Sequence, residues 1–345
     1  MLVVADGGLI VRALVYTGPE SLELQDVTDP DPADGEALVR VRYVGICGTD
    51  LHLWHGEMAA ARPPVVVGHE VVGEVVLDTT GRLAPGTRVA VEPLRTCGRC
   101  RPCRGGFSHV CRNLSVMGVH ADGGAAEYER VPSHRLHPLP DGLSWEDAAL
   151  TEPTSVAVHM TRRAGVQLGD TVLVLGGGPI GFLVASVARA AGAGRVLVSE
   201  VSPARLELCH RAGLETIDAR SADPVEVIRG ITGGEGADVV VEAVGLPSTV
   251  AQMVPAARAH GTVLVGGIGG TPPVDLAAVV FKELTLVGSR VYESRDMATA
   301  VSLLGSGDLD VDGLVTRTVP LAKAVPDGFE RLRDSRDEMK VLLAP

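Results

Sequence analysis

Between residues 161 and 294, short apolar runs alternate with segments of helical character, and this alternation constrains the fold more than any other feature. The runs are TVLVLG, RVLVSE, ADVVVEAVG, GTVLVGG and LTLVGS, at 171–176, 195–200, 237–245, 261–267 and 284–289. Strands that are apolar on both faces belong in a parallel sheet with helices covering both sides. The pattern therefore predicts a doubly wound α/β domain over this region.

A glycine-rich turn follows the first of these predicted strands and opens a helix from about residue 179. It has the pattern G-x-G-x-x-G, which in this context allows a tight turn and brings a dinucleotide pyrophosphate to the helix N-terminus. An unliganded glycine turn is the alternative interpretation. The candidate cofactor-binding residues are Gly176, Gly178, Pro179, Ile180, Gly181, Glu200 and Arg205.

Glu200 ends the second predicted strand, 19 residues after Gly181. A carboxylate at this position accepts hydrogen bonds from the ribose hydroxyls and repels a 2′-phosphate, which favours NAD over NADP. Arg205 is the opposing feature, because a guanidinium can pair with that phosphate. We expect the carboxylate at the strand end to outweigh it, so the predicted cofactor is NAD.

The first 145 residues have a different character. Three valine-rich segments bounded by Gly, Pro and Asp have the composition of strands, at 11–17, 36–46 and 65–76. They predict a compact β domain of barrel type with long loops. A helical pattern follows from Ser144, and the final MKVLLAP predicts a closing strand. Two domains are expected, one of residues 1–160 with 295–345 and one of residues 161–294.

Four of the six cysteines fall within fifteen residues, CGRCRPCRGGFSHVC. They are Cys97, Cys100, Cys103 and Cys111. A disulfide knot, a structural metal site and a redox pair could each use such a cluster. The N-terminus shows no basic segment or cleavage site of a signal peptide, so the expected location is the cytoplasm. Its reducing conditions disfavour disulfides, and the redox interpretation lacks a thioredoxin-like context.

A second set of potential metal ligands is spread along the chain. It consists of Cys47, His69 and either Glu70 or Glu152. A catalytic zinc takes three protein ligands from Cys, His and carboxylate and keeps a fourth position open. Each residue alone has a structural explanation, since an isolated cysteine packs as a small apolar side chain. Their joint occurrence indicates a catalytic metal site in which either glutamate can be the third ligand.

Composition excludes several classes of function. The formal net charge is −12 and aromatic residues make up only 3% of the chain. Such a chain offers neither the basic surface nor the aromatic platforms that bind nucleic acid, and no attraction to anionic lipid. No uncharged apolar run reaches about 18 residues, so no membrane span is predicted. The acidic charge also disfavours a non-enzymatic zinc ribbon fused to a nucleotide sensor.

Six segments in chain order resemble the zinc-dependent medium-chain alcohol dehydrogenases, in the branch of sorbitol-type polyol and 2,3-butanediol dehydrogenases. They are CGTDLH, GHE, the four-cysteine loop, EPTSVAVH, GGGPIG and SEVSPARL. The resemblance runs from about Val11 to the end. It implies a GroES-like β domain with the active site in a cleft against a Rossmann domain. It also implies two zinc ions per subunit, one in a four-cysteine lobe at about 95–113, and a homodimer or homotetramer.

The resemblance further implies roles for single residues. Thr49 and His52 resemble the proton relay of the family, although a surface histidine is the alternative for His52. Glu152 stands where other members have a second cysteine, as in the polyol branch, and is preferred to Glu70 as third zinc ligand. Either glutamate can instead lie outside the set of metal ligands and orient one of the metal-bound groups by a hydrogen bond. Asp50 is a further candidate for such support.

The implied activity is NAD-dependent interconversion of a secondary alcohol and its ketone by hydride transfer. A vicinal diol, a polyol or a cyclitol is the expected substrate. The alternatives are an amino alcohol, as in threonine dehydrogenases, and a cyclitol or aminocyclitol of secondary metabolism. A zinc-free enone or quinone reductase on the same fold is disfavoured, because it would lack Cys47 and His69 and carry a small residue at 200.

Overall fold

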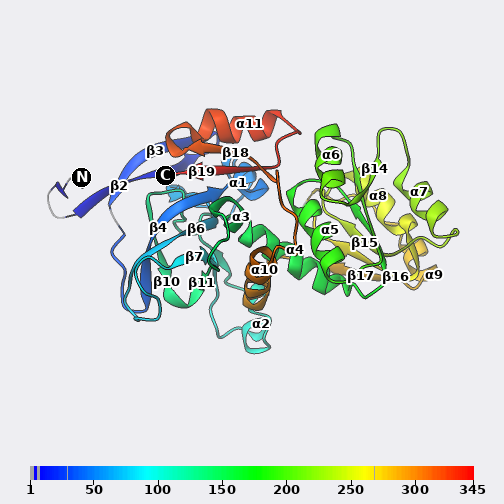
Figure 1. The fold of residues 1–345 in the computed structure, drawn as a ribbon, viewed down its shortest axis with the longest axis horizontal. Helices are drawn as coiled ribbons and strands as arrows, with labels where there is room; N and C mark the ends of the chain where they lie inside the picture. The colour runs from blue at the N-terminus through cyan, green and yellow to red at the C-terminus, as the bar shows by residue number, and fades with distance from the viewer. Residues whose placement is uncertain (1–3, 6–7, 29, 268) are drawn as a thin grey trace. The chain divides into compact units, whose positions relative to one another are not determined.

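The computed structural model describes residues 4–5, 8–28, 30–267 and 269–345 (Figure 1). The chain divides into two compact units. Unit 1 consists of Met1–Glu152, Glu293–Gly305 and Val315–Pro345, and unit 2 consists of Pro153–Tyr292 and Ser306–Leu314. The chain leaves unit 1 at the start of helix α4 (Thr151–Ala164), whereas the sequence pattern placed this boundary at residue 160.

Unit 1 is built mainly from antiparallel strands. Its largest sheet has seven strands in the order β11-β7-β6-β4-β19-β18, with β10 also paired to β4. Their bounds are β4 Glu36–Gly45, β6 Glu70–Asp78, β7 Arg88–Val91, β10 Tyr128–Pro132, β11 Leu136–Pro138, β18 Val315–Pro320 and β19 Lys340–Ala344. Strand β19, the predicted closing strand, pairs with β4 and so brings the C-terminal residues beside the N-terminal half of the chain (Figure 1).

A second sheet and a short ribbon complete the β structure of unit 1. They contain β1 Val4–Ala5, β2 Gly8–Gly18, β3 Ser21–Thr28 and β5 Val65–Val66 in the sheet, and β8 Leu94–Arg95 and β9 Ser115–Val116 in the ribbon. The segment 65–76, predicted as one strand, is broken between β5 and β6. Gly68 has φ +92°, and a Cβ there would lie 2.6 Å from a Val44 methyl group. This break places His69 in a loop rather than inside a ladder.

The strands of unit 1 enclose an aliphatic core with short helices around it. Val39, Val89 and Val341 are fully buried in this core, and Trp54 meets Phe329 edge to face at 5.8 Å between ring centroids. The helices are α1 Gly48–Trp54, α2 Arg101–Arg104, α3 Trp145–Ala148, α10 Ser294–Ser306 and α11 Glu330–Asp334, with 3-10 turns at Ser108–Val110, Ser133–Arg135 and Leu321–Lys323 and a π-helical segment at Ala324–Phe329.

Unit 2 is a six-stranded parallel sheet in the order β14-β13-β12-β15-β16-β17, as the alternating pattern predicted. Its strands are β12 Thr171–Leu175, β13 Arg195–Glu200, β14 Glu215–Asp218, β15 Ala237–Glu242, β16 Ala257–Val265 and β17 Thr285–Gly288. Strand β14 was not predicted, because ETID is short and only its Ile217 is buried.

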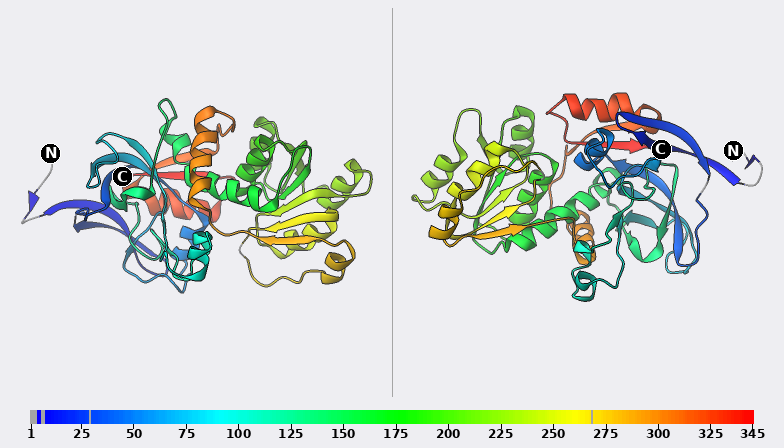
Figure 2. Two further views of the ribbon diagram at one scale, coloured as in Figure 1. Left: turned by 90° about the horizontal axis from the view of Figure 1, so that it is seen from below. Right: turned by 180° about the vertical axis from the view of Figure 1, so that it is seen from behind.

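Helices lie on both faces of this sheet (Figures 1 and 2). They are α5 Pro179–Ala190, α6 Pro203–Arg211, α7 Pro224–Ile231, α8 Pro247–Ala256 and α9 Leu276–Phe281. Helix α5 packs against β12 and β13, and α8 packs against β15 and β16. The longest described helix, α4, has 14 residues, and none in the described part of the chain is long and apolar enough to cross a membrane.

Candidate metal and cofactor sites

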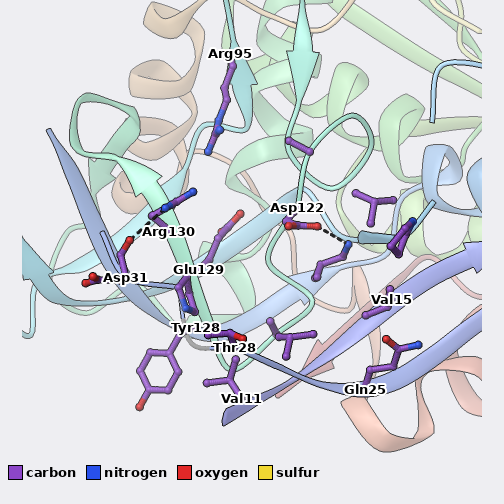
Figure 3. Close-up of a pocket in the computed structure, with 18 residues that line it drawn as sticks. Val11, Val15, Gln25, Thr28, Asp31, Arg95, Asp122, Tyr128, Glu129 and Arg130 are labelled. Atoms are coloured by element: carbon purple, nitrogen blue, oxygen red, sulfur yellow. Dashed lines mark hydrogen bonds between the residues drawn. The ribbon is translucent and has the colours of Figure 1, made fainter. Parts of the chain in front are cut away.

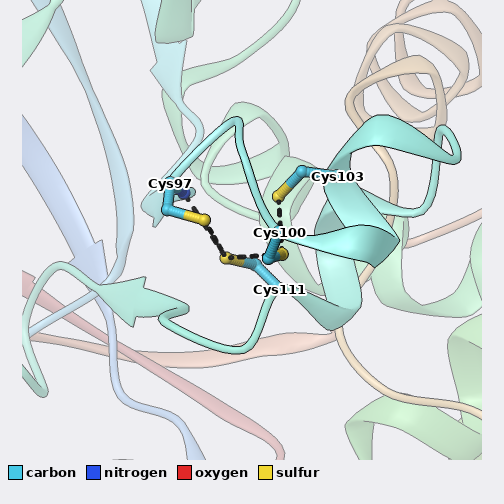
Figure 4. A group of neighbouring side chains, drawn as sticks. All are labelled: Cys97, Cys100, Cys103 and Cys111. Carbon is cyan, nitrogen blue, oxygen red and sulfur yellow. Dashed lines mark hydrogen bonds between the residues drawn. The ribbon is translucent and has the colours of Figure 1, made fainter.

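The four cysteines of the loop converge on one point (Figure 4). Their sulfur atoms lie within 4.8 Å of one another, with contacts of 3.3 Å for Cys100–Cys103, 3.5 Å for Cys97–Cys111 and 3.8 Å for Cys100–Cys111. Four thiolates at about 2.3 Å from one zinc stand about 3.8 Å apart in a tetrahedron. All four cysteines are free of disulfides. The cluster therefore fits a closed, structural zinc site.

Backbone N–H groups donate hydrogen bonds to sulfur atoms of this cluster. The N–H groups of Cys97 and Asn113 donate to the sulfur of Cys111 at 3.4 and 3.3 Å. Hydrogen bonds from the backbone of Cys103 and Arg112 lower the pKa of Cys100 to about 6. Because a metal binds thiolates and not thiols, these donors favour the ligating form of Cys100, whereas burial and the neighbouring thiols raise the pKa of Cys103 to about 12.

Cys47, His69 and Glu70 form a second convergent group in unit 1. Each offers one ligand atom, and the three atoms lie within 4.8 Å of one another. Cys47 precedes helix α1, Glu70 is the first residue of β6, and His69 lies in the loop directly before it. His69 and Glu70 are buried. One sulfur, one nitrogen and one oxygen ligand match the three-ligand set of a catalytic zinc with an open fourth position.

Asp50 supports two members of this group. Its Oδ2 accepts the backbone N–H of Cys47 at 2.8 Å, and its Oδ1 lies 3.4 Å from His69 Nδ1. Neither Oδ1 nor Nδ1 has a hydrogen bond among the described residues. Burial lowers the pKa of His69, but the charges of Asp50 and Cys47 outweigh it and raise this pKa well above its ordinary value. With Nδ1 facing Asp50, Nε2 is the ring nitrogen available to a metal.

Lys340 is a site residue that the sequence pattern did not identify. Its Nζ donates to both carboxylate oxygens of Glu70 at 2.7 Å, and to the carbonyl oxygen of Ile46 at 3.2 Å. Burial lowers the pKa of Lys340, but the charges of Glu70, Cys47 and Glu152 outweigh it and raise this pKa. The available signal was a lysine in the apolar closing strand, since a buried ammonium needs a carboxylate partner.

Glu152 lies outside the convergent group. It is buried at the start of α4, and its charge reaches Lys340. Among the described residues, the oxygen that comes within 4.8 Å of both the Cys47 and His69 ligand atoms belongs to Glu70, not to Glu152. The preference for Glu152 as third ligand stays a prediction, and the convergent group holds Glu70, which is joined to His69 in sequence, whereas Glu152 comes from a separate helix.

Thr49 and His52, the predicted relay, both lie on α1. The side chain of His52 is 54% exposed, and its Nδ1 lies 2.5 Å from Glu57 Oε2. Thr49 is half-buried, and no hydrogen bond joins it to His52 in the described structure. His52 is therefore placed where a proton can reach solvent, with Glu57 as its partner.

In the glycine turn of unit 2, neighbouring atoms lie so close to Gly176 and Gly181 that no side chain would fit, as the motif requires. Gly176 has φ +102°, and a Cβ at that position would lie 2.2 Å from a Val244 methyl carbon. A Cβ at Gly181 would lie 1.9 Å from the carbonyl oxygen of Gly176. Gly178 is the N-cap of α5, with Pro179 and Ile180 in its first turn. A strand–turn–helix of this geometry leaves backbone N–H groups at a helix N-terminus for a pyrophosphate.

Glu200 and Arg205 meet beside this turn. The buried carboxylate of Glu200 accepts the backbone N–H groups of Gly177 at 2.8 Å, Val201 at 2.6 Å and Ser202 at 2.9 Å. Arg205 lies 3.9 Å from the same carboxylate. Both residues that bear on the choice between NAD and NADP therefore lie at the position where the sequence predicted them.

Two family models match the chain: "Alcohol dehydrogenase GroES-like domain" over residues 33–141 and "Zinc-binding dehydrogenase" over residues 179–306. The chain is 37% identical over 335 residues to 2-dehydro-3-deoxy-L-galactonate 5-dehydrogenase of Pseudoalteromonas atlantica, covering 96% of this chain and 98% of that protein. The chain belongs to the zinc-dependent alcohol dehydrogenase family. Within this family it is also 36% identical over 333 residues to L-threonine 3-dehydrogenase of a Chelativorans species, covering 94% and 96% of the two chains.

Solved structures of zinc-dependent alcohol dehydrogenases agree with this assignment. A zinc-binding dehydrogenase from Sinorhizobium meliloti, bound to NADP, superposes with a TM-score of 0.92 at 34% identity, covering 97% of this chain and 99% of that one. The 2R,3R-butanediol dehydrogenase of Bacillus subtilis superposes with a TM-score of 0.91 at 29% identity and the same coverage. The predicted family, the GroES-like and Rossmann fold, and the enzyme class are confirmed.

Proposed function

We propose that this dehydrogenase interconverts a secondary alcohol of a polyol or sugar acid and the corresponding ketone. The observation that carries the proposal is the group of Cys47, His69 and Glu70, whose ligand atoms lie within 4.8 Å of one another. Relatives named L-galactonate-5-dehydrogenase and D-xylulose reductase, each 36% identical, support this substrate class.

Cys47, His69 and Glu70 would hold the catalytic zinc, which when bound acts as a Lewis acid that lowers the pKa of the alcohol hydroxyl. Asp50 holds the backbone of Cys47 and faces the His69 ring, so it orients both ligands. Lys340 matches the buried charge of Glu70. The Thr49 hydroxyl would take the alcohol's proton while giving up its own, and the exposed His52 would release a proton to solvent.

The proposed hydride carrier is NAD, which when bound at the glycine turn accepts hydride at its nicotinamide. Glu200 supports this choice, because its buried carboxylate disfavours a 2′-phosphate beside Gly177. Arg205 is the competing group, and one relative's solved structure holds NADP whereas another holds NADH. We expect kcat/KM to favour NAD⁺ over NADP⁺ and Glu200→Ala to relax the preference. A preference for NADP⁺ in the unmodified enzyme would overturn the choice.

An amino-alcohol substrate is the second candidate. The observation in its favour is the set of L-threonine 3-dehydrogenases among the relatives, at 33–36% identity over at least 94% of this chain. The deciding experiment measures NADH formation with a panel of sugar acids, polyols, cyclitols, 2,3-butanediol and L-threonine. Turnover of L-threonine with kcat/KM above every polyol and sugar acid would replace the first proposal with the second.

We further propose a cytoplasmic homo-oligomer. Strand β17 is the edge strand of the unit 2 sheet, and apolar side chains lie exposed on it and on the neighbouring α9. Leu276, Val280 and Phe281 are 67%, 71% and 88% exposed. A strand with a free edge beside such an apolar patch is suited to pair with a second copy. Light scattering that gives the mass of a single chain would contradict this proposal.

A further inference from the structure

A cavity of about 590 Å³ lies within unit 1, and none of the candidate zinc ligands lines it. Its walls come from β2, β3, β5 and β10 and from the loops beside them (Figure 3). Val11, Val15, Val27 and Val65 supply apolar lining. This volume is in the range of small-ligand sites, which are mostly apolar with a few placed polar groups.

Glu129 on β10 lies in the wall of this cavity (Figure 3). The residue is only 4% exposed, and neither of its carboxylate oxygens has a hydrogen-bond partner among the described residues. Gly124 leaves the space that the carboxylate occupies, since a Cβ there would lie 2.8 Å from Oε2. A buried carboxylate without donors is destabilising, so an unpaired one indicates a missing partner.

Arg95 is the second unpaired group in the same wall. Its charge acts on Glu129, yet no ion pair joins the two, and its buried Nε has no hydrogen-bond partner in the described part of the chain. Two of the other charged lining residues, Arg130 and Asp122, are engaged elsewhere, and Asp31 is exposed. Arg130 contacts Glu36 and the carbonyl oxygen of Asp31, and Asp122 accepts the backbone N–H of Val66 at 3.0 Å.

We propose that this cavity binds a small zwitterion of the α-amino acid type, with its ammonium group at Glu129, whose carboxyl proton is released on binding, and its carboxylate at Arg95. A simple cation would satisfy Glu129 and leave Arg95 unpaired, and a simple anion would do the reverse. A ligand that carries both charges satisfies both groups and places its aliphatic part against the valines. The site is independent of the proposed dehydrogenase activity, because it uses none of the residues assigned to that reaction.

The test is isothermal titration calorimetry of the zinc-loaded enzyme with L-alanine, ethylamine and propionate, three ligands of similar size that differ in charge. L-Alanine should bind more tightly than either of the others. Glu129→Gln and Arg95→Gln should each weaken it by about 10- to 100-fold, the effect of losing one charge-assisted hydrogen bond. Glu127→Gln is the matched control, since Glu127 is a near neighbour in sequence but pairs with the exposed Arg12. Its affinity for L-alanine should match that of the unmodified enzyme.

Three results would overturn the proposal. The first is no binding of L-alanine, and the second is equal binding of ethylamine or propionate. The third is a Glu129→Gln or Arg95→Gln enzyme that keeps full affinity. Binding must also persist in Cys47→Ser, because loss there would assign the alanine site to the catalytic metal instead. Circular dichroism checks that each variant is folded, and if Glu129→Gln is not, Arg95→Gln decides the outcome.

Discussion

Replacing Glu129 by glutamine should stabilise the protein, by an amount that grows with pH. Burial raises the pKa of Glu129 to about 8, and the charge of Arg95 opposes this rise only in part. The carboxyl is protonated in both the folded and the unfolded chain below pH about 4.5. Between that pH and about 8, the unfolded chain releases this proton and the folded chain keeps it. The free energy of unfolding therefore falls as pH rises through this window.

The size of the effect follows from the width of the window. At about 1.4 kcal/mol for each pH unit, the ionisation of Glu129 removes about 2 kcal/mol of stability at pH 6 and about 5 kcal/mol above pH 8. Glutamine has the same shape and no charge to ionise. Its unpaired amide has a cost of its own, but that cost does not change with pH.

Urea unfolding at pH 5, 6, 7 and 8 measures the effect directly. The difference in unfolding free energy between Glu129→Gln and the unmodified protein should increase by about 1 kcal/mol per pH unit across this range. Glu127→Gln, at an exposed ion pair, should show a small difference that stays nearly constant. A constant difference for Glu129→Gln would show that Glu129 titrates normally, and would refute the argument from burial.

Three further outcomes concern the metal sites. Metal analysis should find about two zinc equivalents per chain, and Cys100→Ser should lose one of them; two equivalents in that variant would contradict the closed cysteine site. Glu70→Gln should lower zinc content and reduce kcat by about 10- to 100-fold, with a smaller effect for Glu152→Gln; the reverse order would make Glu152 the third ligand. Lys340→Met should destabilise the protein by about 3–5 kcal/mol in urea unfolding, because Glu70 is left buried without its partner; an unchanged midpoint would show that Glu70 is matched by other groups.

The sequence predicted what depends on residue type and spacing. The glycine turn, the four-cysteine cluster and the parallel sheet follow from local patterns, and five of the six strands of that sheet lie where apolar runs stand. The errors arise where a local pattern is weak or a backbone detail intervenes. Strand β14 has too few buried residues to be recognised, and Gly68 interrupts an apolar segment that otherwise has the composition of one strand.

The sequence pattern could not predict which side chains from distant strands come together in the folded protein. Lys340 meets Glu70 across 270 positions of chain, because β19 pairs with β4 and β4 pairs with β6. Arg95 and Glu129 come to the same cavity from strands of different sheets. Neither pairing has a spacing signature, since each depends on which strands become neighbours when the chain folds.

One criterion, the matching of buried charge, separates the two kinds of site in unit 1. Around His69, the sulfur of Cys47 and the carboxylates of Asp50 and Glu70 gather negative charge, and Lys340 is bonded to Glu70. A divalent cation is the partner that such an excess requires, since buried charges must be matched. The cavity at Glu129 instead has a carboxyl group and a guanidinium in its wall with no ion pair between them, so a ligand that carries both signs of charge satisfies both groups. A metal ion in this cavity would be repelled by Arg95.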